Sequence, residues 1–167
     1  MSAVTAVPFL DLSTAFKALE AEWLETIRAS GAKGSFILGP QTVEFEKEFA
    51  NYVGVKHAIG VANGTDSLVL SLRALGIGPG DEVITTPWTF FASAESISIV
   101  GATPVFVDIR PDTYCLDPDS IVKRLTPKTR AIMPVHIFGH AADMDAIMQI
   151  AKDRKLAVIE DCAQSFG

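Results

Sequence analysis

Three short segments of this 167-residue chain carry side chains suited to binding a small polar ligand. The first is the run Asn63–Ser67, which opens a predicted helix. Gly64 lets a ligand approach the backbone closely, and free N–H groups and the hydroxyl of Thr65 can donate hydrogen bonds to a phosphate at the positive end of the helix dipole. The same pattern is typical of simple helix capping by Thr65 or Asp66, and both interpretations are open.

The second segment begins with a carboxylate. Asp161 directly follows the segment Ala157–Glu160, whose apolar residues predict a buried strand. A buried carboxylate without a partner is costly, so Asp161 needs either a nearby Arg, a helix N-terminus or a cationic atom of a ligand. Glu160 is expected to point to the opposite side, because neighbouring residues of a strand alternate between its faces.

The third segment is aromatic. Trp88, Phe90 and Phe91 follow the predicted strand Glu82–Thr85 and could stack on a planar ring, although packing in the core is the commoner fate of such side chains. Other polar residues indicate less chemistry. We expect no metal site at His136 and His140, since these residues do not lie on one helix. Helix capping explains the acidic residues Asp112, Asp117 and Asp119.

The elements around these segments alternate between short apolar runs and helical patterns. Helices are predicted at Ser13–Ala29 and from Pro40 to Gly54, and strands at Ala58–Val61, Glu82–Thr85, Thr103–Val107, Ala131–Val135 and Ala157–Glu160. Further helices are predicted at Ser67–Leu75, Phe91–Val100, Pro118–Leu125 and Asp143–Asp153. This order indicates an α/β fold, a mainly parallel sheet with helices on both faces. Residues 1–54 then form an N-terminal helical segment and residues 55–167 the α/β domain.

Composition narrows the class of protein. A formal charge of −6 argues against nucleic-acid binding, and 49% hydrophobic residues are enough to build a core. We see neither a membrane span of about 20 apolar residues nor a signal peptide. Two cysteines give no disulfide framework, which suits the cytoplasm. The chain stops at Gly167, shortly after a buried-looking strand, so we expect the N-terminal part of a longer protein.

Taken together, these segments resemble one family, the DegT/StrS family of PLP-dependent nucleotide-sugar aminotransferases. The resemblance lies in Ser35–Pro40, Val55–His57, Asn63–Ser67, Gly78–Ile84, Pro87–Ala92, Gly101–Pro104, Pro134–His136, Ala142–Asp145 and Glu160–Gln164. It implies the first part of the large domain of an aspartate-aminotransferase-like (fold type I) enzyme.

The resemblance also implies roles for individual residues. Gly64 and Thr65 match positions that bind the phosphate of pyridoxal 5′-phosphate (PLP). Phe90 matches the aromatic side chain that stacks on the pyridine ring, and Gln164 matches a residue near the phenolic oxygen of that ring. Asp161 matches the catalytic carboxylate that faces the ring nitrogen, and a pyridinium would be the cation that a buried carboxylate needs.

The reaction implied by the resemblance is transfer of an amino group, usually from glutamate, to a keto group of a nucleotide-linked sugar, in a homodimer. The family's catalytic lysine follows the segment that ends at Gln164, and none of the lysines present matches it. The family's small C-terminal domain is also not contained in this sequence. Two alternatives stay open: a PLP-dependent sugar dehydratase, in which a histidine replaces the lysine, and a non-catalytic regulatory domain that retains the fold.

Overall fold

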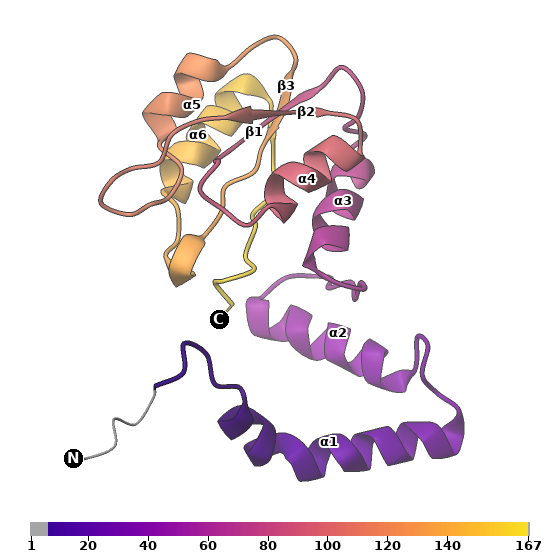
Figure 1. Cartoon of the computed structure of the whole chain (residues 1–167). Helices are drawn as coiled ribbons and strands as arrows, with labels where there is room; N and C mark the ends of the chain where they lie inside the picture. Colours follow the sequence, from indigo (N-terminus) through magenta and orange to yellow (C-terminus); the bar gives the residue numbers. More distant parts are fainter. Residues whose placement is uncertain (1–6, 167) are drawn as a thin grey trace, which may run out of the picture. The chain divides into compact units, whose positions relative to one another are not determined.

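The structure is a computed structural model that describes residues 7–166 (Figure 1). The chain divides into two compact units, the first ending at Gly60 and the second beginning at Val61. The first unit contains the helices α1 (Ser13–Lys33) and α2 (Pro40–Val53). Gly34 ends α1 with a left-handed φ of 62°, and Gly54 ends α2 with a φ of 76°, conformations that glycine adopts without strain. The two predicted helices are therefore confirmed, and α1 is one turn longer than expected.

The second unit is built on a parallel sheet with the strand order β2-β1-β3-β4. Its elements are α3 (Gly64–Ala74), β1 (Glu82–Thr85), α4 (Ala92–Ile99), β2 (Thr103–Phe106), α5 (Pro118–Arg124), β3 (Thr129–Ile132), the 3₁₀ turn η1 (Ile137–Gly139), α6 (Met144–Arg154) and β4 (Ala157–Val158). Four of the five predicted strands and all four predicted helices of this unit are thus present. Their ends lie within a few residues of the predicted positions.

Helices cover both faces of the sheet (Figure 1). Val83 packs with side chains of α3 and α4, whereas its neighbour Ile84 packs with side chains of α5 and α6. The same alternation separates Ala131 from Ile132, and all four of these side chains are fully buried. Successive side chains of a strand point to opposite faces, so burial on both faces requires the continuous apolar runs seen in the sequence. The predicted fold class is confirmed.

One predicted strand is wrong. Residues 58–61 form no strand, and Ile59 in their middle is 81% exposed. The backbone N–H of Gly60 donates to Glu46 Oε1 at 2.7 Å and not to a neighbouring strand. No strand within residues 7–166 pairs with this segment, and an apolar run becomes a strand only where a partner satisfies its backbone groups.

The order of the strands determines where a ligand would bind. The chain passes from β1 outward to β2 and then returns to β3 on the other side of β1. In open parallel sheets, ligands bind beyond the carboxyl ends of the strands at such a reversal. The segments that follow β1, β3 and β4 therefore meet at one edge of the sheet. Within residues 7–166, no helix is both long and apolar enough to cross a membrane.

Candidate functional site

A cavity of about 420 Å³ lies at this edge of the sheet. It brings together the five residues that the sequence singled out from segments far apart in the chain. Gly64 and Thr65 come from the start of α3, Phe90 from the loop after β1, and Asp161 and Gln164 from the segment after β4. The other residues lining the cavity are Ser67, Leu68, Thr89, Ala92, Val135, Ile137, Glu160, Cys162 and Ala163.

Hydrogen-bond donors are concentrated where α3 begins. The side chain of Asn63 caps this helix, because its Oδ1 accepts from the N–H of Asp66 at 2.9 Å and its Nδ2 donates to Asp66 Oδ2 at 3.0 Å. The expectation that Thr65 or Asp66 is the cap is therefore wrong. The backbone N–H groups of Gly64 and Thr65, and the Thr65 hydroxyl, have no partner within the described part of the chain. These three donors are available to an anion.

Gly64 leaves open space in front of these donors. A Cβ atom added at Gly64 would meet no atom within 4 Å, and the residue is not in a left-handed conformation. Neither backbone strain nor crowding by the protein therefore requires a glycine here. Room for a ligand against the backbone is the physical reason that fits the observed geometry.

Asp161 provides a carboxylate at another part of the cavity wall, and its residue is only 8% exposed. Its Oδ2 accepts from Ser93 Oγ at 2.8 Å and its Oδ1 from the N–H of Ala163 at 3.2 Å. Its backbone forms an isolated parallel bridge with Val135, which extends the sheet beyond β3. Among residues 7–166 neither an Arg side chain nor a backbone N–H of a helix N-terminus donates to this carboxylate, so two of the three partners considered are absent there. Neutral donors satisfy part of its capacity, and a cationic atom of a ligand is the alternative that stays open.

Glu160 is among the residues that line the same cavity, but its side chain contacts His136, which is not. The parallel ladder continues past β4, because the N–H groups of Ile159 and Asp161 donate to the carbonyls of Ile132 and Pro134. Glu160 Oε2 lies 2.9 Å from Nε2 of the buried His136, and His136 Nδ1 accepts from the N–H of Ala142 at 3.1 Å. Because Nδ1 accepts, Nε2 carries the proton and donates to Glu160. Both ring nitrogens are therefore engaged in holding the turn after β3.

The aromatic side chains after β1 do not pack in the core, so the alternative interpretation is wrong for them. Phe90 is 77% exposed and lines the cavity, and Phe91 is 70% exposed. Trp88 stacks instead on Tyr114, with ring centroids 6.2 Å apart. Among these aromatic side chains, only Phe90 lines the cavity and can offer a ring face to a ligand there.

Gln164 lines the cavity with its amide orientation set by one hydrogen bond. Its Oε1 accepts from the backbone N–H of Phe138 at 2.7 Å. Because the oxygen is used in this way, the NH₂ group of the side chain keeps its donors for a ligand. An oxygen atom that carries negative charge is the partner that such donors fit.

The negative charges of the Asp161 segment affect the pKa of the neighbouring Cys162 thiol. Burial raises the pKa of Cys162, and the negative charges of Glu160 and Asp161 raise it further. The field at this part of the cavity therefore disfavours negative charge, whereas the start of α3 favours it.

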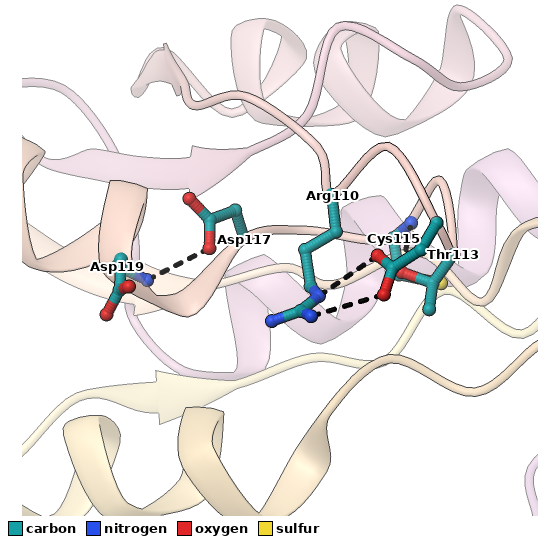
Figure 2. A network of polar contacts seen from close by, with 6 residues as sticks. Arg110, Thr113, Cys115, Asp117 and Asp119 are labelled. Atoms are coloured by element: carbon teal, nitrogen blue, oxygen red, sulfur yellow. Dashed lines mark hydrogen bonds and ion pairs between the residues drawn. The ribbon is translucent and has the colours of Figure 1, made fainter.

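The acidic residues near α5 are satisfied locally (Figure 2). Asp117 caps this helix by accepting from the N–H groups of Asp119 and Ser120. The pKa of Asp117 is lowered, chiefly by the hydrogen bond that the Ser120 hydroxyl donates at 2.6 Å and further by these backbone N–H groups. The Arg110 guanidinium donates two hydrogen bonds of 3.2 Å to Asp112 and holds the pKa of that carboxyl below its usual value. Neither aspartate lines the cavity. The prediction that Asp117 caps a helix is confirmed, but the same prediction is wrong for Asp112, which pairs with Arg110 instead.

The fold and the cavity define a class: a parallel α/β domain with a polar ligand site at its topological switch point. Residues 17–167 match the model of the DegT/DnrJ/EryC1/StrS aminotransferase family, and the chain belongs to this family. The resemblance noted in the sequence is thereby confirmed.

Curated relatives support the same assignment. The chain is 48% identical over 161 residues to the dTDP-3-amino-3,4,6-trideoxy-alpha-D-glucose transaminase of Streptomyces venezuelae, which covers 96% of the chain and 42% of the relative. It is 49% identical to a UDP-N-acetyl-3-dehydro-alpha-D-glucosamine 3-aminotransferase of Acidithiobacillus ferrooxidans, covering 100% of the chain and 45% of the relative. A relative from Geobacillus stearothermophilus, named pleiotropic regulatory protein, is also 48% identical, and the match covers 96% of the chain and 43% of the relative.

Solved structures agree with the fold. The crystal structure of S. venezuelae DesV in complex with a ketimine intermediate matches with a TM-score of 0.94 and 48% identity, over 97% of this chain and 44% of that one. NtdA from Bacillus subtilis with bound cofactor PMP matches with a TM-score of 0.94 and 40% identity, over 98% of this chain and 38% of that one. The predicted fold type I architecture is confirmed. The chain spans less than half the length of these relatives.

Proposed function

We propose that this chain forms part of a PLP-dependent aminotransferase that transfers an amino group from glutamate to a keto group of a nucleotide-linked sugar. One observation carries the proposal: unpartnered donors at the start of α3 and the buried carboxylate of Asp161 line the same cavity. In this assignment residues 1–54 form an N-terminal helical segment, and residues 55–167 form the first part of the cofactor-binding domain.

The residues present fit PLP. The phosphate fits against the N–H groups of Gly64 and Thr65 and the Thr65 hydroxyl, in the space that a Cβ at Gly64 would fill. Phe90 offers an exposed ring face to the pyridine ring, and the free NH₂ group of Gln164 suits the phenolic oxygen. Asp161, satisfied only by neutral donors, lacks the cation that a pyridinium supplies.

When bound, PLP supplies an electron sink for carbanion chemistry, provided that its ring nitrogen is protonated. Asp161 is the catalytic residue that this chain contributes, because its carboxylate keeps a proton at that nitrogen. The Thr65 hydroxyl and the α3 backbone fix the far end of the ligand and so orient the ring. The catalytic lysine is not among the residues of this chain.

Names of relatives support the substrate class. The relatives described above include enzymes named for dTDP-linked and UDP-linked amino sugars, and another is named GDP-perosamine synthase. These names share a sugar carried on a nucleoside diphosphate, which is the substrate class we propose. We further propose a homodimer in the cytoplasm. The reduced cysteines Cys115 and Cys162 are compatible with that compartment.

A regulatory, non-catalytic role is the second candidate, because one relative at 48% identity is named a pleiotropic regulatory protein. A PLP-dependent sugar dehydratase is distinguished from both by the residue at the position of the catalytic lysine. The three assignments differ in what happens to bound cofactor when glutamate is added.

The test is a titration with PLP of the full-length protein, which includes the position of the catalytic lysine, followed by absorption spectroscopy and borohydride reduction. We expect a new absorption band and, after reduction, a cofactor that stays covalently attached. Adding glutamate should then convert the cofactor to its amine form. Pyridoxal without the phosphate, the matched control ligand, should bind more weakly because it leaves the donors of α3 unused. Absence of any band would overturn the proposal, and a band unaffected by glutamate would favour the other two assignments.

A further inference from the structure

A chain of hydroxyl groups leads from the cavity to the carboxylate of Asp161. Thr89 Oγ1 lies 2.9 Å from Ser93 Oγ, and Ser93 Oγ lies 2.8 Å from Asp161 Oδ2. Ser93 is fully buried, and Thr89 is half-buried and lines the cavity. Ser93 and Asp161 are 68 residues apart in sequence, so only the folded sheet brings them together.

The direction of these hydrogen bonds follows from the number of protons. An ionised carboxylate only accepts, so Ser93 must donate its single hydroxyl proton to Asp161. Ser93 Oγ can then only accept from Thr89, and the Thr89 hydroxyl must donate. The order Thr89 to Ser93 to Asp161 is therefore fixed as long as Asp161 is ionised.

Hydrogen bonds hold both carboxylate oxygens and the main chain of Asp161. Oδ2 is bound by Ser93 at the start of α4, and Oδ1 by the backbone N–H of Ala163. The backbone N–H of Asp161 donates to the carbonyl of Pro134 at 2.9 Å, so the main chain is held as well. Each carboxylate oxygen has capacity for another donor, and the cavity is where that donor can come from.

We propose that Ser93, supported by Thr89, is a positioning residue that fixes the Asp161 carboxylate and so determines how firmly a proton is held on the ring nitrogen of bound PLP. This inference rests on the proposed function. Without the Ser93 hydroxyl, the carboxylate loses its orientation. Its hydrogen bond to the ring nitrogen then becomes longer, so the proton on that nitrogen is held less firmly.

Ser96 offers a matched control on the same helix. It is as fully buried as Ser93, but its hydroxyl donates to the Ser93 carbonyl at 3.0 Å and does not contact Asp161. Ser96→Ala therefore removes a buried hydroxyl from α4 without touching the carboxylate. Thr89→Ser is the conservative variant, because it keeps the hydroxyl that donates to Ser93.

The test uses the intact protein loaded with PLP that carries ¹⁵N in the ring, observed by NMR at a fixed neutral pH. We expect the wild type to give a bound resonance of a protonated ring nitrogen. Ser93→Ala should shift this resonance toward that of the free base, and Thr89→Ala should shift it less in the same direction. Ser96→Ala and Thr89→Ser should both leave it at the wild-type position.

The outcomes separate the two proposals. If the wild type gives no bound resonance, the proposed function fails and this inference fails with it. If the wild type binds and the resonance is the same in the Ser93→Ala and Thr89→Ala variants, only the positioning role is overturned. An equal shift in Ser96→Ala would also overturn it, since the effect would then be general to α4. Should Ser93→Ala fail to fold, Thr89→Ala on the cavity wall gives the deciding result.

Discussion

The two polar parts of the cavity are built in opposite ways. At the start of α3, the side chain of Asn63 caps the helix and also donates to the Asp66 carboxylate, and the donors of Gly64 and Thr65 have no partner in the described residues. At Asp161, an acceptor is held by donors from elsewhere in the fold. The first part is local and open, whereas the second depends on tertiary structure and is already partly satisfied. Binding should therefore be most sensitive to the first part and chemistry to the second.

The largest effect is expected from Asp161→Asn. The amide keeps the volume of the side chain but cannot stabilise a pyridinium, so turnover should fall by about 10²–10³-fold. Folding should change little, because the amide oxygen can still accept from Ser93. Steady-state kinetics would measure the turnover, and thermal melting of the cofactor-free protein would measure its stability. Wild-type rates in this variant would remove Asp161 from the mechanism.

Thr65→Ala and Asn63→Ala should separate binding from stability at α3. Loss of one hydrogen bond to a charged phosphate should weaken PLP binding by about 10- to 100-fold, with no change in the stability of the cofactor-free protein. Asn63→Ala removes the cap and should lower the free energy of unfolding by about 0.5–2 kcal/mol.

Titration of PLP by absorption and denaturant unfolding without PLP would check this contrast. If Thr65→Ala melts earlier and binds PLP as tightly as the wild type, the threonine has a structural role and the donors of α3 do not hold the phosphate.

The smallest effect concerns the rate at which Cys162 reacts. Its raised pKa leaves less thiolate at neutral pH than an ordinary cysteine has, so alkylation should be several-fold slower. The rate should rise with pH through a midpoint above the usual value of about 8.5. In Asp161→Asn, one repelling charge is gone, so the midpoint should move down.

Labelling kinetics in a Cys115→Ser background would isolate the Cys162 thiol, because Cys115 is the other cysteine and is buried. A midpoint at or below the usual value would contradict the electrostatic difference between the two parts of the cavity.

The sequence predicted the fold well where the signal is local. The strands at Glu82–Thr85 and Thr103–Phe106 were both located correctly, although only the first is buried and the second lies at the edge of the sheet with Thr103 and Phe106 exposed. The apolar run at residues 58–61 looks similar but forms no strand, since pairing depends on neighbours that the run itself does not reveal. The five candidate site residues line one cavity, but their roles toward PLP stay predictions.

What the sequence could not show were the tertiary partners. The cap at Asn63 was missed because Thr65 and Asp66 fit the capping pattern as well. The contact between Ser93 and Asp161 joins segments 68 residues apart, and no local pattern marks it. Two hydroxyl residues four apart, Thr89 and Ser93, beside an aromatic cluster that follows a strand were the only available signal.

The distance in sequence between Gly64 and Asp161 has a consequence during synthesis. A ribosome adds about 5–20 residues per second, so roughly 100 residues separate the appearance of the two halves of the cavity by about 5–20 s. Throughout that interval the nascent chain contains the residues of the α3 part of the cavity but not Asp161. A cavity that combines both parts can thus form only after translation has passed β4.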